Sequence, residues 1–222
     1  MNIDIAKARK LFEIKKNQLK MVQRRGYEIS KEESLLSYTF EQFLDAYVPF
    51  AEKENKSLRE VFSTTYKNPE QKKLVVYFAE PSKKQLGVEV FGDFLKEMND
   101  QKSNNGIIIT GSALTPATKK EISKLPSNNI YTFMEDEMTY DPTEHFLVPK
   151  HRALSVEEQR NFLNKNDISI DQLPTILTTD MISRYYGFQT GQVIEIKRTN
   201  LYDTIVQYST SYRVVKDEPI NL

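Results

Sequence analysis

Asp180, Glu195 and Lys197 have the residue types that metal-dependent nucleases use for hydrolysis. Glu195-Ile196-Lys197 is a Glu-x-Lys sequence in a segment where apolar and polar residues alternate, and Asp180 lies fifteen positions before Glu195. In such enzymes carboxylates bind Mg²⁺ and a lysine stabilises the developing negative charge. The same pattern arises on any half-exposed strand, and Asp180 also suits a helix N-cap. The sequence leaves both a magnesium-dependent nuclease and an ion-paired strand open.

A second candidate site is the segment Thr115-Pro116-Ala117-Thr118-Lys119-Lys120. Threonine at the N-cap and proline in the first turn are typical of a helix N-terminus. The amides at such an end can donate to a phosphate, and Lys119 and Lys120 add positive charge beside them. An ordinary capped surface helix would have the same sequence. A phosphate contact and a plain surface helix therefore both remain possible.

The two histidines, His145 and His151, flank Pro149 and have no cysteine to join them, because the chain has no cysteine. Zinc usually needs three or four well-placed ligands, so we expect structural hydrogen bonds here and no metal site. The chain contains neither G-x-x-x-x-G-K-[ST] nor G-x-G-x-x-G. We therefore expect no nucleotide cofactor.

Aromatic and basic residues occur together in the last third, as Tyr185, Tyr186, Tyr208, Tyr212 and Arg213. This combination suits both protein interfaces and base stacking. Stacking platforms normally lie in positive grooves, which this balanced sequence does not indicate. We expect these five residues to serve core packing and a subunit interface.

The composition describes a chain long enough for two modest cores. It has 222 residues, of which 39% are apolar, with 31 lysines and arginines against 31 aspartates and glutamates. No overall charge attracts it to nucleic acid or to a membrane, so any DNA contact must be local. No apolar run approaches the roughly 20 residues of a membrane span, and the first residues do not form a signal peptide. We expect a soluble, intracellular protein that contacts no membrane.

The first 142 residues are expected to form an α/β domain with a small, largely parallel sheet. The cationic first 25 residues have an imperfect apolar stripe before Gly26, which predicts a helix that packs on one side, its charges facing solvent or a subunit interface. Further helix starts are indicated by three capping-box pairs: Ser30 with Glu33, Thr39 with Gln42, and Ser57 with Glu60. Strands are expected at 73–79, 106–110 and 129–133, with helices at 88–98 and after Thr115.

A boundary is expected after Pro142, because residues 135–144 include five acidic and no basic residues and Asp141-Pro142 interrupts regular structure. The predicted domains are 1–142 and 143–222. For the second, the pattern predicts a compact α+β unit. Its expected strands lie at 146–148, 192–198 and 202–215, and its expected helices at 156–164 and 181–186.

The second half also carries a family pattern. HFLVPKHRALSVEEQ begins at His145, and QLP, TTDMISRYYGFQTGQVIEIKR and SYRVV follow in order, with looser matches such as Leu114-Thr115-Pro116-Ala117 in the first half. This sequence resembles the fifth subunit shared by nuclear RNA polymerases I, II and III, whose C-terminal core is similar to a small subunit of archaeal RNA polymerase. It departs from the family pattern at Met181, at Gln189-Thr190, at 201–207 and in its extended end, 216–222.

The resemblance implies a non-catalytic polymerase subunit in the nucleus. Its first domain would form part of the lower jaw, where Thr115–Lys120 approaches downstream duplex DNA without reading bases. Its second domain would be an assembly domain that anchors to the largest subunit, near other polymerase subunits. The implied interface residues are His145, Pro149, Lys150, His151, Tyr185, Tyr186, Tyr212 and Arg213. An adaptor of similar fold outside any polymerase remains an alternative.

Overall fold

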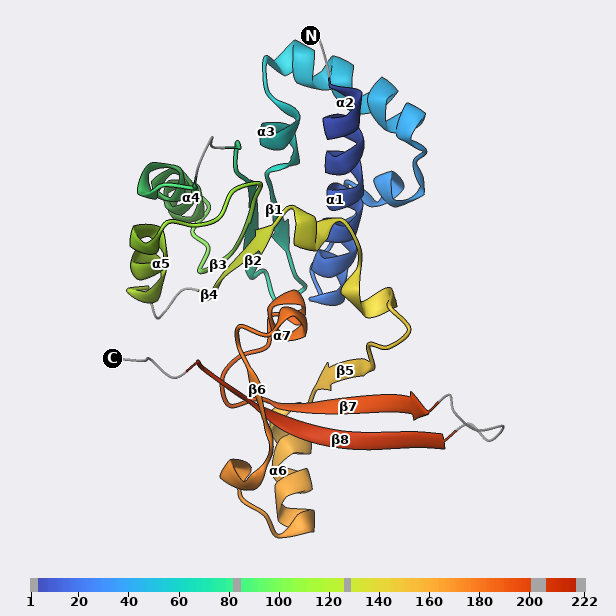
Figure 1. Cartoon of the computed structure of the whole chain (residues 1–222), viewed down its shortest axis with the longest axis vertical. Coiled ribbons are helices and arrows are strands. Elements are labelled where there is room, and N and C mark those ends of the chain that lie inside the picture. Colours follow the sequence, from blue (N-terminus) through green and yellow to red (C-terminus); the bar gives the residue numbers. More distant parts are fainter. Residues whose placement is uncertain (1–3, 82–84, 126–128, 201–206, 219–222) are drawn as a thin grey trace. The chain divides into compact units, whose positions relative to one another are not determined.

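The computed structural model describes residues 4–81, 85–125, 129–200 and 207–218 (Figure 1). Contacts divide the chain into two compact units, Met1–Tyr140 and Asp141–Leu222. The sequence predicted an α/β unit followed by an α+β unit, and the structure confirms two units that combine helices with β-sheets. Within the described residues, no helix combines the length and the apolar character needed to cross a membrane.

The first unit opens with helices: α1 (Ile5–Arg24), α2 (Phe40–Glu54) and α3 (Leu58–Phe62). The capping boxes predicted at Thr39 and Ser57 are both formed. The one predicted at Ser30 is wrong, because the chain there enters a 3₁₀ helix, η1 (Glu33–Ser37), whose N-cap is Glu32 and which has no side-chain cap.

The prediction that α1 packs on one side only is also wrong. Its buried positions include apolar Leu11, Phe12 and Ile14 but also polar Asn17 and Lys15. These positions lie around most of the helix circumference. Polar residues can be buried here because they have partners: the Asn17 amide donates to the Met138 carbonyl at 3.0 Å.

The sheet of the first unit has the order β1-β2-β3-β4. Its strands are β1 (Thr64–Lys67), β2 (Lys73–Phe78), β3 (Asn105–Thr110) and β4 (Asn129–Met134). The pairs β2–β3 and β3–β4 are parallel, and β1–β2 is antiparallel. Strand β1 was not predicted, because Thr-Thr-Tyr-Lys is too short and too polar to stand out.

Two helices, α4 (Val88–Asp100) and α5 (Pro116–Ser123), connect the parallel strands and lie on one side of the sheet, opposite α1 (Figure 1). Phe91, Phe94 and Met98 of α4 pack with Ile108 of β3. A Cβ at Gly106 would lie 2.5 Å from the Phe94 ring. Only glycine at this position of β3 lets α4 approach so closely.

The sheet of the second unit has the order β5-β7-β8-β6. Its strands are β5 (Lys150–Ala153), β6 (Thr175–Leu177), β7 (Val193–Asn200) and β8 (Gln207–Lys216), all antiparallel neighbours except β6 and β8. Its helices are α6 (Val156–Asn166) and α7 (Met181–Tyr186). Short 3₁₀ helices lie at Asp136–Met138 in the first unit and at Pro142–Glu144 and Ile170–Gln172 in the second.

The two faces of this second sheet are covered by different helices. Val193 and Val214 pack with Phe162 and Leu163 of α6. Ile194 and Ile196, which alternate with Val193 along β7, pack with Ile182 and Tyr186 of α7. We call these the α6 face and the α7 face.

The strand expected at 146–148 is wrong. Residues 145–148 form a turn in which the Val148 amide donates to the His145 carbonyl at 2.9 Å, and β5 begins only after Pro149. Phe146 and Leu147 are 75% and 67% exposed. An apolar run makes a strand only where a neighbouring strand supplies hydrogen bonds, and β7 supplies them from Lys150 onward. The expected strand at 202–215 corresponds to β8, and residues 201–206 lie outside the described part.

Lys15 is the most unusual residue of the first unit, because its side chain is completely buried. Its ammonium lies 2.9 Å from the Glu32 carboxylate and donates to the Phe62 carbonyl at 3.1 Å and to the Tyr66 hydroxyl at 3.0 Å. The Tyr66 hydroxyl in turn donates to Glu32. Burial lowers the pKa of Lys15, and the Glu32 carboxylate opposes that shift. The ammonium thus joins α1, the loop before η1, the end of α3 and strand β1.

Replacing Lys15 by methionine should reduce the free energy of unfolding by about 3–5 kcal/mol, because it leaves a largely buried Glu32 carboxylate without its counter-ion. Denaturant unfolding of the full chain measures this. The neighbouring change Lys16→Met is the control and should cost less than about 1 kcal/mol, because the Lys16 side chain is only half-buried, whereas that of Lys15 is completely buried. A Lys15→Met protein as stable as the Lys16→Met protein would contradict the role assigned to the buried ammonium.

The burial of Tyr47 predicts that the protein loses stability in alkaline solution. Its ring packs edge-on against Phe62 at 5.7 Å, and burial, with the Glu32 charge, raises the pKa of its phenol to about 12. In the unfolded chain the Tyr47 phenol ionises near pH 10. The contribution of Tyr47 to the free energy of unfolding is therefore intact below pH 10 and is lost as the pH rises from about 10 to 12. Tyr47→Phe should match the parent protein at pH 7 and exceed its stability at pH 11. Tyr140→Phe, at a ring that is 57% exposed, is the control and should give no such gain.

Candidate nucleic-acid and subunit interfaces

Two threonines fix the N-terminus of α5. Thr115 is the N-cap and its hydroxyl oxygen accepts from the Thr118 amide at 3.1 Å. The buried Thr118 hydroxyl donates to the Leu86 carbonyl at 3.1 Å and lies 2.8 Å from the Thr115 hydroxyl. Because a hydroxyl has one hydrogen, Thr115 must be the donor between the two. The capped end is therefore tied to the loop before α4.

This helix end offers fewer amides to a phosphate than the sequence suggested. Pro116 has no N–H, the Thr118 amide is capped, and the Lys119 amide donates to the Thr115 carbonyl at 3.0 Å. Among positions 116–119, only the Ala117 N–H has no acceptor within the described residues. The first turn has no acidic residue, and Lys119 and Lys120 are exposed. Any attraction to phosphate here rests chiefly on the two ammonium groups.

Some of the cationic side chains of α1 form ion pairs within the first unit. Lys10 lies 2.7 Å from Asp136 and 3.7 Å from Glu135, and Lys15 is paired with Glu32. The expectation that these charges face solvent or another subunit is wrong for Lys15. Glu135 also binds the Arg59 guanidinium, so the acidic segment before the domain boundary packs into the first unit instead of forming a solvated linker.

The three residues of the nuclease hypothesis do not converge. Asp180 caps α7, accepting from the Ile182 amide at 2.8 Å and the Ser183 amide at 3.3 Å. Glu195 alternates with Ile194 and so points to the α6 face, whereas α7 covers the opposite face. Among the described residues no group of three acidic, histidine or cysteine side chains could hold a metal ion. The geometry gives a helix cap and, separately, a charged strand.

Glu195 belongs to an ion-pair network on the α6 face. Its carboxylate lies 3.2 Å from Lys197 and 3.4 Å from Arg152, and Arg152 also binds Glu158 at 2.8 Å. Burial raises the pKa of Glu195, but Lys197 and Arg152 outweigh it, so the pKa is lowered overall. The network links β5, β7 and the first turn of α6, which explains these residues without catalysis.

Both histidines make local hydrogen bonds. His145 is exposed, accepts from the Leu147 amide at 3.3 Å, and stacks on Phe146 with ring centroids 5.0 Å apart. The Nδ1 of His151 lies 2.8 Å from the Pro149 carbonyl, which can only accept, so Nδ1 carries the hydrogen. Burial lowers the pKa of His151, so its ring is neutral at pH 7.

The aromatic and basic residues of the predicted interface differ in exposure. Tyr185 has no accessible surface, so it cannot offer its ring to another subunit, and this part of the prediction is corrected. Tyr186 is half-buried and stacks on Phe188 at 5.2 Å. Tyr212, also half-buried, packs on Phe162 of α6 at 4.0 Å. Arg213 donates to the Thr175 carbonyl at 2.9 Å.

Phe146 and Leu147 are exposed apolar side chains whose sequence pattern predicted a strand, so they were not among the predicted interface residues. They lie between the predicted interface residues His145 and Pro149. Large apolar groups exposed side by side mark binding surfaces more often than polar ones do. The available signal was the proline after them, since a proline is unusual inside a paired strand.

The Thr115 cap makes a testable contribution to stability. Thr115→Ala removes an acceptor for the Thr118 amide and should lower the free energy of unfolding by about 1 kcal/mol. Thr115→Ser keeps the hydroxyl and should cost less than half as much. Denaturant unfolding of the two variants provides the comparison, and equal stabilities would mean that the hydroxyl does not hold this helix end.

Comparison with known proteins matches both units. The model described as RNA polymerase Rpb5, N-terminal domain, matches residues 6–98, and the model described as RNA polymerase Rpb5, C-terminal domain, matches residues 140–215. Together they cover more than half of the chain.

Curated relatives agree along most of the sequence. DNA-directed RNA polymerase subunit 5-like protein 1 of Arabidopsis thaliana is 33% identical over 86% of this chain and 90% of its own length. The proteins named DNA-directed RNA polymerases I, II, and III subunit RPABC1 from Caenorhabditis briggsae and Caenorhabditis elegans are each 31% identical over 93% of this chain and 95% of their own. The chain therefore belongs to the Rpb5 family of RNA polymerase subunits.

Proposed function

We propose that this chain is a non-catalytic subunit shared by nuclear RNA polymerases I, II and III and that it acts in the nucleus. The observation that carries the proposal is the match of both Rpb5 domain models, joined by relatives that are named for these three polymerases and align over 93% of the chain. The separation of Asp180 from Glu195 removes the specific support for a nuclease.

The second unit is proposed to be the assembly domain, which binds the largest polymerase subunit. Its contact residues are His145, Pro149, Lys150, His151, Tyr186, Tyr212 and Arg213. The exposed side chains of Phe146 and Leu147 support this proposal, because they give the segment around His145 an apolar surface to bury. Other polymerase subunits are further partners, as its family indicates.

The first unit is proposed to form part of the lower jaw beside downstream duplex DNA. Thr115, Pro116, Ala117, Thr118, Lys119 and Lys120 form the proposed contact. Lys119 and Lys120 are exposed, whereas Pro116 and Ala117 have no side-chain group that could distinguish bases. Such a contact is electrostatic and independent of sequence. The equal numbers of acidic and basic residues fit a subunit that adds a few charges to a field supplied by larger subunits.

Purification of the tagged chain from its own cells tests the proposed function. We expect the largest subunits of all three nuclear polymerases to co-purify in amounts comparable with the tagged chain. A chain that migrates alone, or with partners that include no polymerase subunit, would support an adaptor outside the polymerase and contradict the proposal.

The proposed DNA contact predicts that reversing the charges of Lys119 and Lys120 makes the affinity of polymerase for DNA depend less on salt. In assembled polymerase, Lys119→Glu with Lys120→Glu should lower affinity for downstream duplex and reduce the slope of log affinity against log salt by about 1–2, because up to two phosphate contacts are lost. Lys53→Glu with Lys56→Glu makes the same charge change at exposed residues on α2 and just after it, and serves as control. Equal slopes for the two double variants would rule out the contact at α5.

A further inference from the structure

Strands β7 and β8 extend beyond the strands that flank them. They pair along the whole length of β7, from Val193 with Val214 to Asn200 with Gln207. In contrast, β5 pairs with β7 only from Ile194 to Lys197, and β6 pairs with β8 only from Val214 to Lys216. Figure 1 shows the result as a two-stranded ribbon that projects past β5 and β6.

The projecting ribbon has no apolar core of its own. The core clusters of the second unit include β7 residues up to Ile196 and β8 residues from Tyr212 onward, and no described residue nearer the connecting segment. Ser209, Thr210 and Ser211 are exposed. A two-stranded ribbon without packing is only marginally stable in water. Its regular register therefore suggests that another surface completes it.

One edge of the ribbon presents unpaired backbone groups. The Val214 amide donates across that edge to the Pro174 carbonyl at 2.9 Å, whereas the Val215 amide points the other way, to the Gln192 carbonyl. Backbone direction alternates along a strand, so the N–H and C=O groups of Tyr212 and Thr210 point to the same edge as those of Val214. They have no backbone partner within the described residues. We call the β8 edge from Gln207 to Arg213 the open edge.

The open edge exists because β6 is short. Pro174, just before β6, has no N–H, and the chain before it forms a 3₁₀ helix closed by a capping box between Ser169 and Gln172. The edge has little of the usual protection either, because Gln207–Arg213 contains no proline and only one charged residue, Arg213, and Ser209, Thr210 and Ser211 are small enough to let another strand approach.

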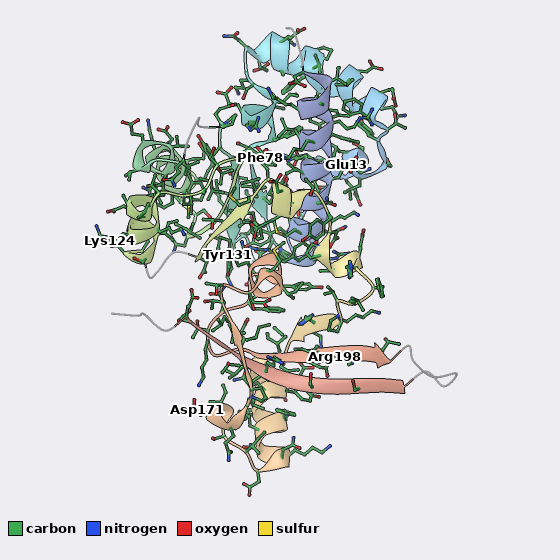
Figure 2. The ribbon with its side chains drawn as sticks, in the orientation of Figure 1. Glu13, Phe78, Lys124, Tyr131, Asp171 and Arg198 are labelled. Carbon is green, nitrogen blue, oxygen red and sulfur yellow. The ribbon has the colours of Figure 1, made fainter. Side chains whose placement is uncertain are left out.

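The charge beside the open edge is positive. Arg213 lies on β8, and Lys197 and Arg198 lie opposite Thr210 and Ser209. Figure 2 labels Arg198 on the β7 part of the ribbon. Arg198 has no ion pair with any described residue, and Lys197 has one, with Glu195. No carboxylate occurs in 196–200 or 207–213. An extended segment with acidic side chains would therefore complement both the backbone groups and the charge.

We propose that an extended, acidic segment of a larger polymerase subunit adds to the second sheet as a strand along the open edge of β8. The inference rests on the proposed function, because it takes the partner from the assembled polymerase. Main-chain hydrogen bonds to Thr210 and Tyr212 hold the added strand, and its carboxylates face Arg198 and Arg213.

Amide hydrogen exchange tests the position of the added strand. The full chain is compared free and after incorporation into purified polymerase, by following the peptide that covers 207–213. Exchange at the Thr210 and Tyr212 amides should slow at least tenfold on incorporation. An incorporated chain with unchanged exchange at these amides overturns the strand addition and leaves the proposed function intact. A chain that does not enter polymerase at all overturns the proposed function and the strand addition with it.

Thr210→Pro tests the backbone contact directly. The Thr210 amide points away from β7, so proline removes a donor from the open edge without removing a β7–β8 hydrogen bond. Incorporation in competition with the parent chain should fall at least tenfold, whereas Thr210→Val should compete equally. Thermal unfolding of the free variants verifies that both are folded. Equal incorporation of a folded Thr210→Pro protein would refute the proposal.

Arg198→Glu tests the charge of the partner. This change should weaken incorporation into polymerase several-fold and make the remaining incorporation less sensitive to salt. The control Lys165→Glu, at an exposed residue of α6, should have no effect. An improvement with Arg198→Glu would exclude an acidic partner. Self-association of the free chain that protects the same amides would show instead that a second copy occupies the edge, and would also overturn the proposal.

Discussion

The first unit is organised around one ammonium group that is removed from water. Lys15 reaches from α1 to the Glu32 carboxylate, the carbonyl at the end of α3 and the Tyr66 hydroxyl on β1. Removing a charge from water costs several kcal/mol, and the cost is offset only if each donor hydrogen finds an acceptor in good geometry. The ammonium therefore selects one arrangement of the helical third against the sheet. Misplacement of any one segment would leave a buried charge unpaired.

That constraint matters for the proposed DNA contact. Residues on α5 can meet a duplex reproducibly only if the sheet that carries α5 is rigid. The sheet is held on one side by the packing of α4 against Gly106 and on the other by the helices that Lys15 fixes. The α5 end is then tied to the chain before α4 through Thr118 and Leu86. Two flexible ammonium groups are thus presented from a well-defined helix end.

The second unit uses the two faces and one edge of its sheet for different purposes. The α6 face carries the Glu195 network and the α7 face an apolar core, so both faces are covered near β5 and β6. The edge of β8 is covered only where β6 runs beside it. Binding by strand addition would therefore leave the two cores undisturbed, and the energy of association would come from main-chain hydrogen bonds that the free unit cannot make.

An α/β unit followed by an α+β unit, most helix starts and the family could be predicted from the sequence, because helix caps, buried strand runs and the order of motifs are local signals. The helix at 181–186 was predicted with its observed bounds, since Asp180 and Gly187 mark both ends.

The burial of individual side chains could not be predicted in the same way. In the sequence, Lys15 cannot be distinguished from a surface lysine, and its burial depends on contacts with Glu32, Phe62 and Tyr66. Phe146 and Leu147 have the sequence of a strand, but among the described residues no neighbouring strand pairs with them. Asp180 and Glu195 are close in sequence, yet strand alternation places Glu195 on the face opposite α7. Each of these outcomes depends on contacts between distant segments, which no local pattern encodes.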